Sequence, residues 1–139
     1  MKESVLLESE QFNLSLDFQV FESDVAYPSN TILSVCVLSS GFSASSTMDI
    51  DIKAVPAFCG ELEKIYDLLK GNAKIEEPYG DQYIVFSGDG LGHIMISGIL
   101  KSHGENGFCQ ELKFENSIDQ TYLPKFLKKL IGFSKQFLK

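Results

Sequence analysis

Two aspartates two positions apart, Asp49 and Asp51, come closest in this chain to a reactive or metal-binding pair. They fall in an alternating segment, 47–54, that predicts a β-strand, and side chains two positions apart on a strand project from the same face. Carboxylate oxygens are the ligands that Mg²⁺ and Ca²⁺ prefer. Two ligands do not complete a metal site, and the sequence spacing does not identify a third ligand. A solvated strand face, or part of an anionic contact surface, is therefore the simpler interpretation.

The other reactive residue types are few and scattered. None of Cys36, Cys59 and Cys109 belongs to a CxxC pair, and His93 and His103 lack metal-ligand spacing. Cys59 lies near the start of a predicted helix, whose dipole favours a thiolate, but its neighbours provide no base. We therefore expect reduced thiols packed as small apolar side chains, with no catalytic residue, metal or cofactor. Unpaired thiols and the lack of a signal peptide indicate a cytoplasmic protein.

Three glycines, Gly88, Gly90 and Gly92, resemble part of a phosphate-binding loop. A dinucleotide-binding fingerprint joins a strand to a helix, whereas a second strand is predicted to follow these glycines. Asp89 and Gly90 together are typical of a tight hairpin turn, because both residues tolerate a positive φ. We therefore interpret this segment as a hairpin.

Hydrophobic periodicity predicts the elements that would position these residues. Apolar and polar residues alternate over 12–20, which predicts a strand with one buried face. The segment 31–38 is almost wholly apolar and predicts a central strand covered on both faces. We expect a small-residue loop at 39–46 before the strand at 47–54, and Met1 to Leu7 as an optional edge strand.

The segment after residue 54 predicts a helix with Pro56 in its first turn and Gly71 just beyond its end. Its apolar stripe follows the 3.6-residue period and consists of Phe58, Leu62, Ile65, Tyr66 and Leu69. A second amphipathic helix follows Asp119, a good helix cap, with Pro124 near its start. Between the helices we expect strands at 82–87, 93–100 and 108–115, with an optional edge strand at 74–77.

The predicted fold is therefore one α+β domain spanning residues 1–139, with the order β-β-β-α-β-β-β-α and the optional edge strands in addition. Most strands follow one another through short turns. This arrangement favours a mostly antiparallel sheet of about six to eight strands, with the two amphipathic helices packed on it.

Charge is distributed unevenly along the chain. All 12 cationic residues are lysines, and all 19 acidic residues lie at or before Asp119. The formal net charge of −7 and the absence of arginine argue against a nucleic-acid partner, because phosphates are bound mainly by Lys and Arg. The last 20 residues carry five lysines, Lys125, Lys128, Lys129, Lys135 and Lys139, which we assign to the outer side of the terminal helix rather than to a membrane surface.

An acidic domain of this kind fits a basic protein partner. The acidic residues expected to point outward form the candidate contact set: Glu22, Asp24, Asp49, Asp51, Glu76, Glu77, Asp81 and Asp89.

The order of motifs resembles that of a known family. The helix segment ELEKIYDLLKG, the strand segment QYIVFSGDGLGHIMISGIL and above all the ending KFENSIDQTYLPKFLKKL are similar to the WapI-like immunity proteins of bacterial polymorphic toxin systems. The resemblance covers nearly the whole chain. It implies a non-enzymatic function: the protein binds one toxin domain and neutralises it in the producing cell. An acidic inhibitor would suit a basic, nuclease-like toxin.

Two other functions stay open at this stage. A small-molecule or metal-dependent enzyme would hold Asp49 and Asp51 in a concave pocket together with a His or Cys. A structural or accessory subunit of a larger complex would instead expose a large apolar patch.

Overall fold

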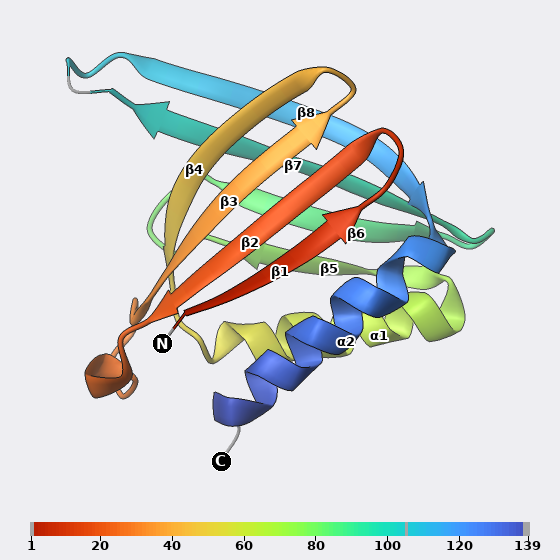
Figure 1. The fold of residues 1–139 in the computed structure, drawn as a ribbon, viewed down its shortest axis with the longest axis horizontal. Helices are drawn as coiled ribbons and strands as arrows, with labels where there is room; N and C mark the ends of the chain where they lie inside the picture. Colours follow the sequence, from red (N-terminus) through yellow and green to blue (C-terminus); the bar gives the residue numbers. More distant parts are fainter. Residues whose placement is uncertain (1, 105, 138–139) are drawn as a thin grey trace.

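The computed structural model describes residues 2–104 and 106–137, which form two four-stranded antiparallel sheets and two helices (Figure 1). In chain order, the elements are β1 (Lys2–Glu8), β2 (Phe12–Val20), the 3₁₀ turn η1 (Glu22–Asp24), β3 (Thr31–Ser39), β4 (Phe42–Ile50), α1 (Ala54–Leu68), β5 (Lys70–Glu76), β6 (Tyr83–Asp89), β7 (His93–His103), β8 (Cys109–Asp119), η2 (Gln120–Tyr122), α2 (Leu123–Ser134) and η3 (Lys135–Phe137). Met1 and Lys139, which belong to the predicted first strand and terminal lysine set, lie outside the described residues.

The α+β class, the antiparallel pairing and the two helices are confirmed, but the predicted strand order is wrong. Four strands precede each helix, and they form separate sheets in the orders β1-β2-β3-β4 and β5-β6-β7-β8. The two missing strands are those treated as optional, β1 and β5. Both are edge strands with charged, mostly exposed residues, so their periodicity is weak.

The predicted loop at 39–46 is in fact the hairpin of β3 and β4. Ser40 and Gly41 have φ values of 48° and 91°, so a two-residue turn reverses the chain. The small residues that follow pair in register with β3, from Phe42 opposite Ser39 to Ile50 opposite Thr31. The strand predicted over 47–54 therefore begins earlier and stops at Ile50.

The strand β3 is covered on one face, not on both. Its alternate residues from Thr31 to Ser39 are buried, whereas Cys36 and Leu38 on the other face are exposed. Its apolar sequence suggested a strand enclosed between two layers, yet no other layer of the described structure covers its outer side (Figure 1).

The helix α1 ends on Leu69, which adopts the left-handed conformation at φ 60° and donates its N–H to the Ile65 carbonyl. The chain enters β5 at once, so Gly71 lies inside that strand rather than at the helix end. Pro56 lies in the first turn, as predicted. The Asp119 side chain accepts the Thr121 N–H and caps η2, which leads into α2.

The two sheets face each other and approach most closely where β4 crosses β7, while α1 and α2 fill the opposite side next to β5 and β1 (Figure 1). Phe86 lies at the centre, with its ring 5.7 Å from that of Phe58 on α1 and 6.0 Å from that of Phe126 on α2. Both sheets and both helices thus share one continuous apolar core. None of the described helices has the length and apolar character needed to cross a lipid bilayer.

Candidate functional site

Seven of the eight candidate acids lie at one end of the molecule, on three neighbouring segments (Figure 1). We call this region the acidic end: Glu22 and Asp24 on η1, Asp49 and Asp51 at the end of β4, and Glu76, Glu77 and Asp81 at the end of β5 and in the loop before β6. A direct hydrogen bond joins two of the segments, because the Asp49 N–H donates to Glu77 Oε2 at 3.2 Å.

A buried amide, Asn30, fixes the first half of the acidic end. Its side chain is 1% exposed and donates through Nδ2 to the Val25 and Tyr27 carbonyls and to Asp51 Oδ1 at 3.0 Å. Its Oδ1 accepts the Ile52 N–H at 2.8 Å. The loop after η1 is thereby tied to the junction between β4 and α1.

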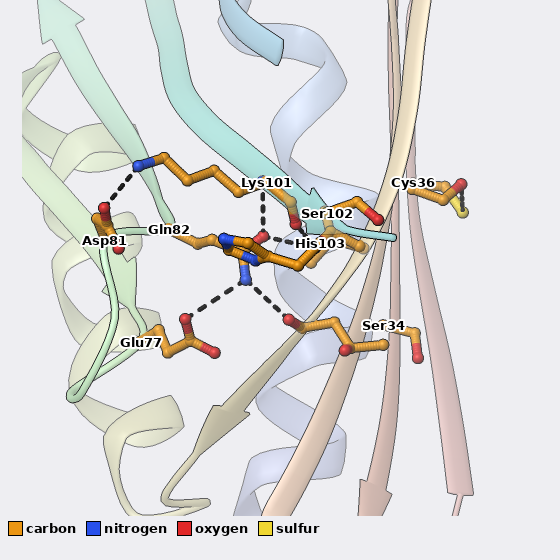
Figure 2. Close-up of a pocket in the computed structure, with 12 residues that line it drawn as sticks. Ser34, Cys36, Glu77, Asp81, Gln82, Lys101, Ser102 and His103 are labelled. Carbon is orange, nitrogen blue, oxygen red and sulfur yellow. Dashed lines mark hydrogen bonds and ion pairs between the residues drawn. The ribbon is translucent and has the colours of Figure 1, made fainter. Parts of the chain in front are cut away.

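A second buried amide, Gln82, fixes the other half (Figure 2). Its side chain is 7% exposed, and Nε2 donates to the Thr47 carbonyl at 2.8 Å and to Glu77 Oε1 at 3.4 Å. Its Oε1 accepts the Lys101 N–H at 2.9 Å. The free edge of β4 is thus bound to the second sheet through side chains, which also satisfies part of an otherwise unpaired edge.

The charges at the acidic end are only partly balanced. Lys101 Nζ lies 2.5 Å from Asp81 Oδ2, and Lys74 Nζ lies 2.9 Å from Glu76 Oε2. The hydrogen bond from Lys101 lowers the pKa of Asp81, and the same bond raises the pKa of Lys101. Within residues 2–104 and 106–137, the remaining acids make no ion pair: Glu22, Asp24, Asp49, Asp51 and Glu77.

A polar groove of about 620 Å³ opens beside these residues (Figure 2). Its charged residues are Glu77, Asp81 and Lys101, and most of the rest of its wall consists of hydroxyl side chains from β3, β4 and β7. Carboxylates and hydroxyls accept hydrogen bonds from ammonium and guanidinium groups. The groove therefore has the chemistry to receive a cationic side chain.

Asp49 and Asp51 do not share a strand face, because β4 ends at Ile50. Asp51 Oδ1 accepts the Lys53 N–H at 2.9 Å as well as the Asn30 amide, so this carboxylate shapes the entry to α1. No cluster of three or more His, Cys, Asp or Glu side chains suited to a metal ion occurs among the described residues.

Asp89 is the candidate that the fold separates from the others, because it lies where β6 turns into β7, at the opposite end of the second sheet (Figure 1). Its Oδ1 accepts the N–H groups of Leu91 at 2.7 Å and His93 at 3.1 Å. These bonds, led by that from Leu91, lower the pKa of Asp89. The antiparallel pairing of β6 with β7 confirms the hairpin interpretation of the glycine segment, in which Gly90 has φ 85°.

The three cysteines are free thiols, but only one is packed as predicted. Cys59 is 3% exposed, and burial raises the pKa of its thiol, which opposes the thiolate that a nucleophile needs. Cys36 and Cys109 are exposed.

Sequence reasoning missed the residues that organise the acidic end. Asn30 and Gln82 each stand immediately before an apolar strand, which is the one local signal they carry. Their partners lie 21 and 35 residues away along the chain, at Asp51 and Thr47. Lys101 was likewise overlooked, since its pairing with Asp81 depends on the β6–β7 register.

Compared with known protein families and with curated proteins, the chain matches none of them.

Proposed function

We propose that this protein is an immunity-type inhibitor that binds a basic, nuclease-like toxin domain through its acidic end and neutralises it by stoichiometric, non-enzymatic binding. One observation carries the proposal: five carboxylates without an ion pair among the described residues are gathered at one end, on segments fixed by two buried amides.

Fixed charges suit fast and specific binding. A surface of one sign speeds the approach of an oppositely charged partner, and this steering weakens as salt screens the charges. Because Asn30 and Gln82 hold the backbone in place, little ordering is needed on contact, which reduces the free-energy cost of association. An arginine or lysine of the toxin could enter the polar groove beside Glu77.

The resemblance of residues 113–130 to the WapI-like immunity proteins favours the same function and supplies the class of partner. The alternatives have less support. An enzyme using Asp49 and Asp51 would need both carboxylates free to act together, whereas Asp51 is engaged by Asn30 and Lys53. The accessory-subunit alternative would rest on exposed apolar side chains such as Leu6, Leu38 and Phe42, which identify no class of partner.

The test is the association rate with a toxin domain, which we expect to be encoded beside the gene for this protein. The double variant Glu22→Gln and Asp24→Asn removes two exposed charges that make no ion pair within the described chain. We expect its association rate at low salt to fall by about tenfold, within the range of electrostatic steering. Stopped-flow fluorescence over a salt series measures the effect.

The matched control is Glu10→Gln with Glu115→Gln, which removes two exposed acids outside the acidic end. We expect this control to change the rate much less. An equal loss in both double variants would show that net charge matters and the acidic end does not. Failure of the wild type to form a complex at low salt would contradict the proposed function itself.

A further inference from the structure

A second groove, of about 490 Å³, runs between α1 and α2 and is separate from the acidic end. Its floor is largely apolar and includes Tyr66, Leu127 and Ile131. Tyr66 was predicted to belong to the buried stripe of α1, yet 40% of its surface is exposed here. The two helices therefore leave an apolar strip that their mutual packing does not cover.

The two rims of this groove carry opposite charges. Glu63 and Asp67 form the α1 rim, and Lys128 and Lys135 form the α2 rim. All four are exposed, and none makes an ion pair with any other described residue. The groove thus combines an apolar floor with two charged rims, whose four charged side chains make no ion pair among the described residues of the monomer.

We propose that this groove binds a second copy of the same chain in a two-fold symmetric dimer. A two-fold axis parallel to the groove exchanges the rims, so the acidic rim of each copy faces the basic rim of the other. An axis across the groove would set like charges against each other. The rim charges therefore favour one symmetric arrangement, in which four charged residues per copy gain partners around a buried apolar floor.

Gly132 on the groove wall is consistent with close approach by another copy. A Cβ atom added at this position would meet no atom within 4 Å in the monomer, so internal packing does not require a glycine here. Glycine is unfavourable inside a helix, but it permits another chain to come near the backbone. Because the groove and the acidic end share no residue, the dimer would leave both acidic ends open, and the inference does not rest on the proposed function.

The decisive experiment uses two full-length variants with reversed rims. One carries Glu63→Lys with Asp67→Lys, so both of its rims are basic, and the other carries Lys128→Glu with Lys135→Glu, so both are acidic. Sedimentation velocity between about 1 and 100 µM, which covers moderate to weak self-association, should show a dimer for the wild type. Each variant alone should be a monomer, and an equimolar mixture should form a heterodimer.

A second variant, Gly132→Gln, blocks the groove with an uncharged side chain. We expect it to be monomeric and no less stable to heat than the wild type, because the added side chain points into open space. The control Lys113→Glu with Glu115→Lys reverses two exposed charges on β8 and should leave the dimer intact. A wild type that stays monomeric throughout, a mixture of rim variants that does not associate, or a dimer that survives Gly132→Gln would each overturn the proposal.

Discussion

At the scale of single residues, two neutral carboxamides do most to shape the acidic end. Gln82 donates through Nε2 to the Thr47 carbonyl and accepts the Lys101 N–H through Oε1, so it needs a donor and an acceptor at once. A glutamate could not donate to Thr47 and would add another carboxylate beside Glu77. An uncharged amide can be buried here without the desolvation cost of a charge.

We predict that Gln82→Leu lowers the free energy of unfolding by roughly 1–3 kcal/mol, because the part-buried hydrogen bonds to the Thr47 carbonyl and from the Lys101 N–H are lost, at about 0.5–1.5 kcal/mol each. Urea unfolding followed by circular dichroism measures the change. The control is Gln110→Leu, since Gln110 is an exposed residue on β8 and should tolerate the change with little effect. Equal stability of the two variants would show that the side-chain hydrogen bonds of Gln82 do not stabilise the folded state.

The chemistry of single residues could be read from the sequence only in part. The exposure of Glu22, Asp24 and Asp49 follows from their polarity and is confirmed. Their gathering with Glu77 at one end depends on how two sheets stack, and no local pattern contains that information. The role of Asn30 could not be read from the sequence, because its partner Asp51 is brought to it only by the pairing of β3 with β4.

At the scale of elements, the entry to the last helix depends on a charged cap. Asp119 Oδ2 accepts both the hydroxyl proton of Thr121, at 2.7 Å, and the Thr121 N–H, at 3.1 Å. The hydroxyl bond, followed by the backbone bond, lowers the pKa of Asp119 below its ordinary value of 3.8. The carboxylate therefore favours the folded state above that pH, and this contribution is lost as the pH falls through the lower folded-state pKa.

We predict that Asp119→Asn, which keeps an acceptor oxygen but loses the charge, unfolds more easily than the wild type near neutral pH. The difference should shrink as the pH falls below 3.8, because the wild-type carboxylate then becomes protonated. Thermal unfolding across the acid range tests this, with Glu115→Gln as a control for removal of one exposed acid. A difference that is constant with pH would rule out the charge as its source.

Elements with a one-sided pattern were the easiest to predict. The strand β2 spans Phe12–Val20 as expected, since alternate residues along its whole length face the core. The first half of β4 was missed because its small residues show no alternation, and only pairing with β3 keeps them extended. The end of α1 was also misjudged, because Leu69 takes the left-handed position that glycine usually occupies.

At the scale of the whole molecule, one core joins both sheets and both α-helices. Cys59 belongs to this core, with its Sγ 3.9 Å from the Ser134 hydroxyl of α2, whereas Cys36 and Cys109 lie on the surface. The division of the chain into two sheets could not be foreseen, because it depends on contacts between β4 and β7 and between the helices and the edge strands.

We predict that a thiol reagent labels two cysteines rapidly in the native protein and the third, Cys59, only as fast as the whole domain unfolds. Burial and a raised thiol pKa both protect Cys59. Mass spectrometry of timed alkylation, with and without urea, identifies each site. Rapid labelling of Cys59 in native conditions would indicate that the α1–α2 layer opens separately from the sheets.

The acidic end draws its carboxylates from segments attached to both sheets: η1 connects β2 with β3 and β4 is an edge of the first sheet, whereas the β5–β6 loop connects two strands of the second. A toxin domain that covered the full width of this surface would therefore contact both sheets at once. It would have to dissociate before the two sheets could separate. Because only the packed arrangement of the two sheets offers the complete surface, a bound partner of the proposed kind would add to the resistance of the protein to heat and proteases.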